Sequence, residues 1–277
     1  MVAQQPYIFT LPVKMYLYLS MLHQEFQAPE VLQNVIKCFW HNKRAAGNEQ
    51  LAFEVMPDGY AEIIFYFGNT VSVMQNGVLQ ALPSPFIMGL LNQPVTFYSK
   101  NHLEIIAIRC FPWTVFDLLG LPSAQDDIFI FEHPISKLQS TLEELIPAGK
   151  INEAIEHLAQ YFSQTQQNFA ANSMLYKAGL AMQLAKGAMP ISEVAAAAHA
   201  TIRTLERNFK HSSGYTVKTV SGLMRFEQVR NRLWTNPDSN LSSLAHELGY
   251  TDQSHLSREF KRYSGFTPAA FARKVKK

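Results

Sequence analysis

Cysteine is scarce in this chain: Cys38 and Cys110 are the only two among 277 residues. Two thiols cannot form a framework of several disulfides, and they cannot supply a four-cysteine zinc site. Free cysteines are usually buried, and they suit a reducing compartment. We therefore expect two buried thiols in a cytoplasmic protein without a metal or other cofactor.

Long apolar runs are also missing. No window reaches eighteen consecutive apolar residues, and residues 1–26 show no basic stretch followed by an unbroken apolar run. A membrane span and an export signal both need such runs, so we expect neither. The composition, 47% hydrophobic and 17% charged over a length that suits two domains, is typical of a folded, soluble protein.

Each part of the chain is poor in charges of one sign. Residues 1–171 hold 8 lysines and arginines against 15 acidic residues, a net charge of −7, whereas residues 172–277 hold 16 against 7, a net charge of +9. The polar stretch from Gln164 to Asn172 is the candidate boundary between the two parts, with the end of a preceding helix as the alternative. We expect a regulatory or dimerisation domain in 1–171 and a domain that binds a polyanion in 172–277.

The N-terminal part has short β-rich runs separated by turn signals. Asn76-Gly77 between two runs predicts a hairpin, and Pro57-Asp58-Gly59 precedes another run. Short strands with this spacing favour a β-sandwich or a small barrel. The runs are LAFEVM (51–56), EIIFYF (62–67), VSVMQ (71–75), VTFYS (95–99) and HLEIIAIRCF (102–111).

Helical periodicity replaces the strand pattern after Phe111. Val115 to Leu119 predicts a short amphipathic turn, and Ile135 to Ile146 predicts a helix. From Ile151 to Phe162, apolar residues recur on one helix face, which would pack on the barrel or on a second copy in a homodimer. We would seek the dimer interface within Ile135 to Phe169. The fold class expected is α+β, with a barrel and flanking helices followed by an all-α domain.

The C-terminal part contains an internal repeat with a period of about fifty residues. ISEVA (191–195) matches LSSLA (241–245), RNFK (207–210) matches REFK (258–261), and GYT (214–216) matches GFT (265–267). Each copy should be one supersecondary unit. The small residue that ends the first match in each copy allows a second helix to cross closely, so the repeat predicts two helix-turn-helix units.

Single residues predict the turn and the helix cap of each unit. Gly249 suits a positive φ in the second turn, and His199 stands at the matching place in the first. Thr201 and Thr251 are placed to cap the second helix of their units through a hydroxyl that accepts a backbone N–H.

The second helix of each copy has an apolar and a polar face. Ile202, Leu205 and Phe209 should face inward in the first copy, as should Leu256 and Phe260 in the second. The polar faces carry groups that can read base edges or hold phosphates in a major groove. The candidate DNA-binding residues are Arg203, Thr204, Glu206, Arg207 and Lys210 in the first copy, and Gln253, Ser254, His255, Ser257, Arg258 and Lys261 in the second.

A single helix from Lys218 to Trp234 should connect the two copies. At ~1.5 Å per residue it would run about 25 Å, which could hold the two second helices near the roughly 34 Å that separates successive major grooves. Arg225, Arg230 and Arg232 on this connector are candidates for phosphate contacts, for solvated charges or for internal ion pairs.

These motifs resemble the DNA-binding domain of AraC-type transcription regulators. The resemblance rests on the second copy from Ala245 through Gly249 to Lys261, and on Gly265-Phe266-Thr267-Pro268. It implies binding to double-stranded DNA, and RNA polymerase as a further partner of an activator. Val217 stands where family members more often have proline, so the first unit is the less typical one. The base contacts that the resemblance implies come from Arg203, Glu206 and Arg207, and from Gln253, Ser254 and Arg258.

A second resemblance covers about Phe26 to Leu121. The segments are similar to a domain that precedes the DNA-binding module in some AraC-type regulators, which implies a cupin-like regulatory domain. They are Cys38-Phe39-Trp40, Met56-Pro57-Asp58-Gly59, Ile87-Met88-Gly89 and Ile108-Arg109-Cys110-Phe111-Pro112.

The N-terminal domain has three possible roles: sensing a small molecule, dimerisation alone, or catalysis. Strand aromatics could line an apolar pocket for an effector, or form plain core. A metal enzyme would need clustered ligands, and the scattered histidines show no such spacing, so we expect no enzyme. Asp58, Glu62 and Arg109 lie near predicted strand ends and could be structural. The candidate ligand-binding aromatics are Trp40, Phe53, Phe65, Phe67 and Phe97.

Overall fold

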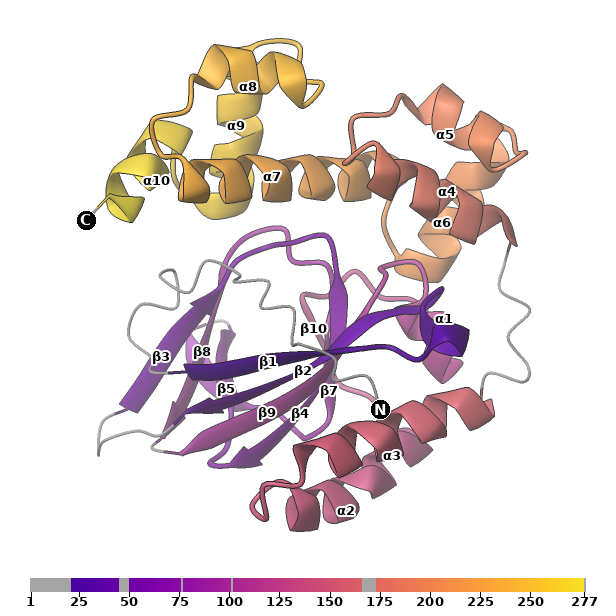
Figure 1. Ribbon diagram of the computed structural model, residues 1–277, viewed down its shortest axis with the longest axis vertical. Coiled ribbons are helices and arrows are strands. Elements are labelled where there is room, and N and C mark those ends of the chain that lie inside the picture. Colours follow the sequence, from indigo (N-terminus) through magenta and orange to yellow (C-terminus); the bar gives the residue numbers. More distant parts are fainter. Residues whose placement is uncertain (1–20, 45–49, 76, 101, 166–172, 277) are drawn as a thin grey trace, which may run out of the picture.

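Two antiparallel sheets form the N-terminal part of the protein. The computed structural model describes residues 21–44, 50–75, 77–100, 102–165 and 173–276 (Figure 1). The first sheet has the strand order β1-β2-β9-β4-β7-β10, and the second has the order β3-β8-β5-β6. The strands are β1 (Met21–Gln27), β2 (Ile36–Arg44), β3 (Gln50–Val55), β4 (Ala61–Gly68), β5 (Ser72–Gln75), β6 (Val78–Ala81), β7 (Phe86–Met88), β8 (Val95–Lys100), β9 (Leu103–Cys110) and β10 (Ile128–Phe129).

All five predicted runs are strands, and the predicted hairpin is present. β5 pairs with β6 so that Gln75 lies opposite Val78, and Gly77 has a φ of 77°. Asn76 itself lies outside the described residues. Strands β1, β2, β7 and β10 were not predicted from the sequence. In β2 the register shifts between Ile36 and Cys38, and such a bulge breaks the strict alternation by which a strand is recognised.

The first sheet separates two apolar cores because alternate side chains of a strand point to opposite faces. Ile63 and Phe65 of β4 face the helices α1 (Val115–Leu119), α2 (Leu138–Leu145) and α3 (Ile151–Thr165). Ile64 faces the second sheet. In Figure 1, α2 and α3 lie along the outer side of the first sheet.

The predicted apolar face of α3 packs on the barrel. Ile155, Leu158 and Phe162 are buried against the first sheet together with α1 and α2. This face is therefore used within one chain, and Phe169 lies outside the described residues. The helix predicted from Ile135 to Ile146 is divided into a short 3₁₀ turn, Pro134–Lys137, and α2.

The C-terminal part is entirely helical in its described residues. Its helices are α4 (Ser173–Leu184), α5 (Ile191–Ala197), α6 (Ile202–Ser213), α7 (Val217–Thr235), α8 (Leu241–Glu247), α9 (Gln253–Ser264) and α10 (Pro268–Val275). The connector α7 has 19 residues and so runs about 28 Å. The boundary expected between residues 171 and 172 lies outside the described residues.

Two expectations from composition can be compared with the structure. Cys38 and Cys110 are free and buried. Within the described ranges, none of the helices combines the length and the apolar character that crossing a bilayer requires.

Candidate DNA interface

Two helix-turn-helix units are present where the repeat predicts them. We call α5 and α6 unit one, and α8 and α9 unit two. Ala195 and Ala245 are buried where the helices of each unit meet. The turn residues His199 and Gly249 have φ values of 52° and 74°, so the histidine does adopt the left-handed conformation that glycine adopts in the other unit.

The second helices of the two units are capped by residues at equivalent positions, but one cap was predicted wrongly. The Thr201 hydroxyl accepts a hydrogen bond from the Thr204 N–H (3.2 Å), as expected. In unit two the cap is Asp252, whose carboxylate accepts from the His255 N–H (2.7 Å), and Thr251 precedes it. The turn of unit two is one residue longer, so the cap moves by one position.

The inner faces of α6 and α9 match residue for residue. Leu205 and Phe209 are fully buried, as are Leu256 and Phe260. Ile202 is the exception to the predicted inner face: its side chain is 45% exposed, so the expectation that it packs inward is wrong.

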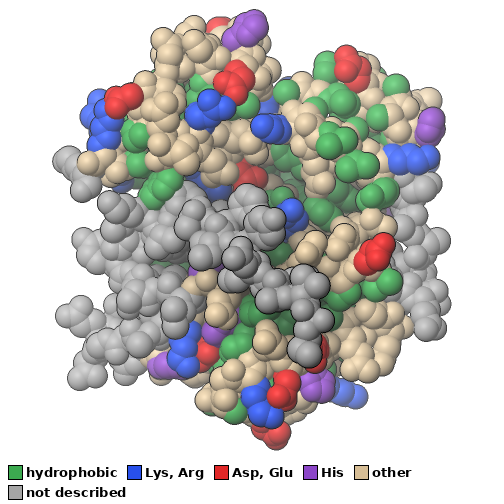
Figure 2. Space-filling model, viewed as in Figure 1, with side chains coloured by type: hydrophobic (Ala, Val, Ile, Leu, Met, Phe, Trp, Pro, Cys, Tyr) green, Lys and Arg blue, Asp and Glu red, His purple; other side chains and the backbone are tan. Residues whose placement is uncertain are grey.

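The outer faces present most of the candidate DNA-binding side chains to solvent. Arg203, Arg207 and Lys210 are exposed on α6, and so are Gln253, Ser254, Arg258 and Lys261 on α9, whereas Thr204, Glu206, His255 and Ser257 are half-buried. The units form separate lobes above the barrel, with Lys and Arg side chains at the outer edge of both lobes (Figure 2).

Three of the half-buried candidates have partners within the chain. Glu206 accepts a hydrogen bond from the Val217 N–H (3.3 Å), so its carboxylate lies at the positive N-terminus of α7. The Thr204 hydroxyl is 2.9 Å from that of Thr201. The His255 ring lies 3.4 Å from the Thr251 hydroxyl. The freely exposed part of each outer face is therefore narrower than the sequence suggests.

The arginines of α7 have internal partners. Arg225 donates to the Gly187 carbonyl (2.8 Å) and pairs with Glu259 of α9 (3.2 Å). Arg232 pairs with Glu247 of α8 (2.7 Å). Of the alternatives open from the sequence, internal pairing describes these side chains, which fasten unit two to the connector.

Unit one shares an apolar core with the N-terminal part. Trp113 is 3% exposed, and its ring lies 5.5 Å from that of Phe209 on α6 and 5.3 Å from that of Phe111. Gly179 of α4 lies directly against the indole, where a side chain would not fit. No local sequence pattern marks a contact between residues so far apart in the chain, so Trp113 was not predicted to be a junction residue.

Polar contacts reinforce this junction. Tyr215 follows α6, and its hydroxyl oxygen is 3.0 Å from the carbonyl oxygens of both Leu90 and Gln125. The Gln125 side-chain amide donates to the carbonyl of Gly214 (2.5 Å). The end of α6 is therefore held by loops of the N-terminal part.

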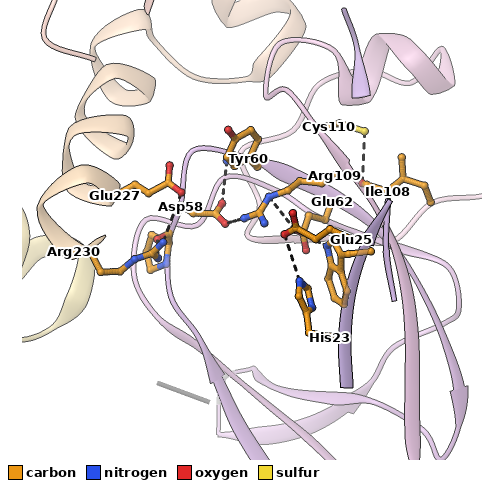
Figure 3. Close-up of polar contacts among 12 residues, drawn as sticks. His23, Glu25, Asp58, Tyr60, Glu62, Ile108, Arg109, Cys110, Glu227 and Arg230 are labelled. Atoms are coloured by element: carbon orange, nitrogen blue, oxygen red, sulfur yellow. Dashed lines mark hydrogen bonds and ion pairs between the residues drawn. The ribbon is translucent and has the colours of Figure 1, made fainter. Parts of the chain in front are cut away.

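A second junction connects the barrel to the connector helix. Arg109 of β9 pairs with Asp58 and lies 3.5 Å from Glu62, and its guanidinium stacks on Tyr60 (4.6 Å to the ring centre). Figure 3 shows these groups pointing toward one another, with α7 beside them. The three charged residues named as structural candidates thus do come together.

The connector contributes charged groups to the same place. Arg230 of α7 donates to the Pro57 carbonyl (3.1 Å) and lies 3.7 Å from Glu227 (Figure 3). Burial raises the pKa of Glu62 to about 7, and burial also raises the pKa of Glu227. Both shifts arise because burial removes water that would stabilise the charged carboxylates.

The structure divides the five candidate ligand-binding aromatics between two cores. Phe53 and Phe97 stack at 5.6 Å between the two sheets, and Trp40 packs against the same core. Phe65 and Phe67 point to the opposite face of the first sheet, toward the helices. The five therefore cannot line one pocket.

Two family models match the chain. Residues 194–274 match a helix-turn-helix domain, and residues 24–126 match a domain of unknown function, DUF6597. The first match covers most of α5 and all of α6 to α9. The second match covers much the same residues as the N-terminal resemblance drawn from the sequence.

Known proteins are similar over different lengths. RhaS transcriptional activators of Pectobacterium carotovorum and Pectobacterium atrosepticum are 33% identical over 61 residues, which is 22% of this chain and 22% of each relative. The chain thus matches about a fifth of the length of these curated relatives.

Among solved structures, ToxT of Vibrio cholerae aligns with 84% of this chain and 97% of its own, at 12% identity and a TM-score of 0.43. The DNA-binding domain of AdpA, solved in complex with a target DNA, aligns with 38% of this chain and 93% of its own, at 22% identity and a TM-score of 0.34.

Replacing the cap of α9 should destabilise the protein selectively. We expect Asp252→Ala to lower the free energy of unfolding by about 1 kcal/mol, because the His255 N–H loses its acceptor. Thr251→Ala is the matched control, since that hydroxyl does not cap the helix. Urea unfolding of both variants gives the comparison, and a larger loss in Thr251→Ala would contradict the assignment.

Glu62 should make stability depend on pH. Its pKa in the folded protein, about 7, exceeds its ordinary value of 4.5, so the unfolded chain releases the proton first. Stability relative to Glu62→Gln should therefore fall as pH rises from about 5 to 7, and level off above that range. Urea unfolding of both proteins at several pH values measures this difference. A difference that is constant over the range would show that burial does not shift this carboxyl.

Proposed function

We propose that this chain, whose residues 194–274 match a helix-turn-helix domain, is an AraC-type transcription regulator that binds a specific sequence in double-stranded DNA. The observation that carries the proposal is the structural repeat. Two equivalent helices, α6 and α9, each bury an apolar face and expose arginine, lysine or amide side chains on the other. A recognition helix needs one apolar face that packs on its own domain and one polar face that contacts the bases and phosphates of a major groove.

One chain would read two half-sites. α7 connects the two units, and unit two packs on it through the Phe226–Phe260 contact and the part-buried Arg225–Glu259 ion pair. The net charge of +9 over residues 172–277 attracts the phosphate backbone. We assign base contacts to Arg203 and Arg207 in unit one and to Gln253, Ser254 and Arg258 in unit two. Lys210 and Lys261 suit phosphates.

The N-terminal part would control this DNA binding. Two junctions support this proposal. Trp113 links the barrel side to unit one, and the Arg109 cluster lies beside α7, so a change in the conformation of the barrel could be passed to both. We propose a small-molecule effector of the barrel or homodimerisation as the signal, and RNA polymerase as a partner if the chain is an activator. Because its target is the chromosome, we place the chain in the bacterial cytoplasm.

Catalysis by the N-terminal part is the alternative. The curated relatives are transcriptional activators that match this chain over 61 residues, and the proposed role does not need a catalytic unit. Among the residues that the structure describes, no group of three His, Cys, Asp or Glu side chains is placed to hold a metal ion. We propose regulation rather than enzyme activity.

Arg258→Ala should weaken specific binding more than non-specific binding. We expect a loss of about 1–3 kcal/mol at the preferred site, because a bidentate contact to guanine is removed. Arg262→Ala on the same helix removes the same charge and should affect all sequences alike. Fluorescence anisotropy with a selected duplex and a scrambled one measures both. Equal losses on the two duplexes would contradict the assignment of Arg258.

Binding should also fall steeply with salt. The two phosphate contacts assigned to Lys210 and Lys261 alone predict a roughly tenfold loss of affinity between 50 and 200 mM salt, because binding releases counterions, and each further contact steepens the loss. A salt-independent affinity would contradict binding through the basic region.

An effector should act on both stability and DNA binding. A compound that binds the folded barrel at 100 times its Kd should stabilise the full chain by about 2.7 kcal/mol. A thermal-shift screen of metabolites finds such compounds, and anisotropy then tests them. A compound that raises Tm without changing DNA affinity would not be an effector.

A further inference from the structure

Ile202 is an aliphatic residue at a solvent-exposed position. It is 45% exposed at the start of α6, and it is the only exposed large hydrophobic side chain among the described residues from 191 to 276. It does not belong to the apolar core that unit one shares with α7 and the barrel. Isolated exposed apolar residues are common, so the position of Ile202 matters more than its exposure.

The repeat gives Ile202 a structural counterpart, Gln253. Each is the first residue after a cap, Thr201 or Asp252, whose side chain accepts a hydrogen bond from the third helical residue. Both helices have 12 residues and end at a glycine in the left-handed conformation. The two side chains therefore leave equivalent points at the beginning of equivalent helices.

We propose that Ile202 reads the 5-methyl group of a thymine in the half-site of unit one. This inference rests on the proposed DNA binding and adds a specificity residue to it. The first residues of a recognition helix contact base edges in the major groove. Thymine carries the apolar group on that edge, whereas adenine offers the donor and acceptor that suit Gln253.

The neighbours of Ile202 support this role. Arg203 and Arg207 are exposed on the same helix, whereas Glu206 is bound to the N-terminus of α7 and Thr204 to the cap. The exposed surface at the start of α6 thus combines one aliphatic group with guanidinium groups, which suits thymine next to guanine. The corresponding surface of α9 is polar. The two half-sites should therefore differ in sequence.

The test removes only the methyl group from the DNA. After the preferred duplex has been selected with the full chain, each thymine is replaced in turn by deoxyuridine, and Kd is measured by fluorescence anisotropy. At one thymine of the unit-one half-site the parent should lose affinity roughly fourfold, the effect of one buried methyl group. Ile202→Ala should bind both duplexes equally.

Further variants separate a contact from a general effect on folding. Ile202→Val should keep part of the sensitivity to deoxyuridine, and Ile202→Gln should shift the preference at that position from thymine to adenine. All variants should keep the thermal midpoint of the parent, because the side chain is exposed. Substitutions in the unit-two half-site should affect parent and variants alike.

The outcomes distinguish this inference from the proposed function. If the parent selects a specific duplex but no thymine in the unit-one half-site is sensitive to loss of its methyl group, the role of Ile202 is overturned. The same holds if Ile202→Ala keeps the sensitivity. If no duplex is selected at all, the proposed function fails.

Discussion

The burial of Trp113 joins the two parts of the chain, and the placement of unit one depends on it. The indole lies between Phe111 from the barrel side and Phe209 from α6, inside one continuous core. Aromatic contacts of this kind gain both from removal of apolar surface from water and from ring geometry. The Tyr215 hydroxyl, which lies within 3.0 Å of two loop carbonyl oxygens, adds a hydrogen bond beside this core. Unit one is thus held by the barrel side as well as by its own connector.

Unit two is held differently. Its contacts with the connector include charged pairs, Arg225 with Glu259 and Arg232 with Glu247. The barrel reaches that connector through a separate polar junction, where Arg230 binds the Pro57 carbonyl. Unit one therefore contacts the barrel side directly through Trp113, while unit two packs on α7, where the Phe226 ring contacts Phe260. A signal from the barrel that alters their relative placement would act on the spacing of two half-sites.

The repeat made the helical part largely predictable, because apolar positions such as Phe209 and Phe260 recur with the period of a helix. Details that depend on tertiary contacts were not predictable. The partner of Glu206 is a backbone N–H on another helix. The cap of α9 is Asp252, one residue after the predicted Thr251. In the barrel, alternation alone places Phe65 opposite to Ile64, but the sequence analysis grouped aromatics by type. The bulge in β2 concealed a central strand.

The contact between Trp113 and Gly179 also limits how such chains can be recombined. A barrel that carries this indole needs a partner helix with no side chain at the matching point, and only glycine meets that need. Exchange of DNA-binding modules between relatives would therefore succeed only when both sides of the junction are inherited together. A chimera that joins this barrel to a DNA-binding domain with a larger residue at the position of Gly179 would have a steric clash with Trp113 at the domain interface.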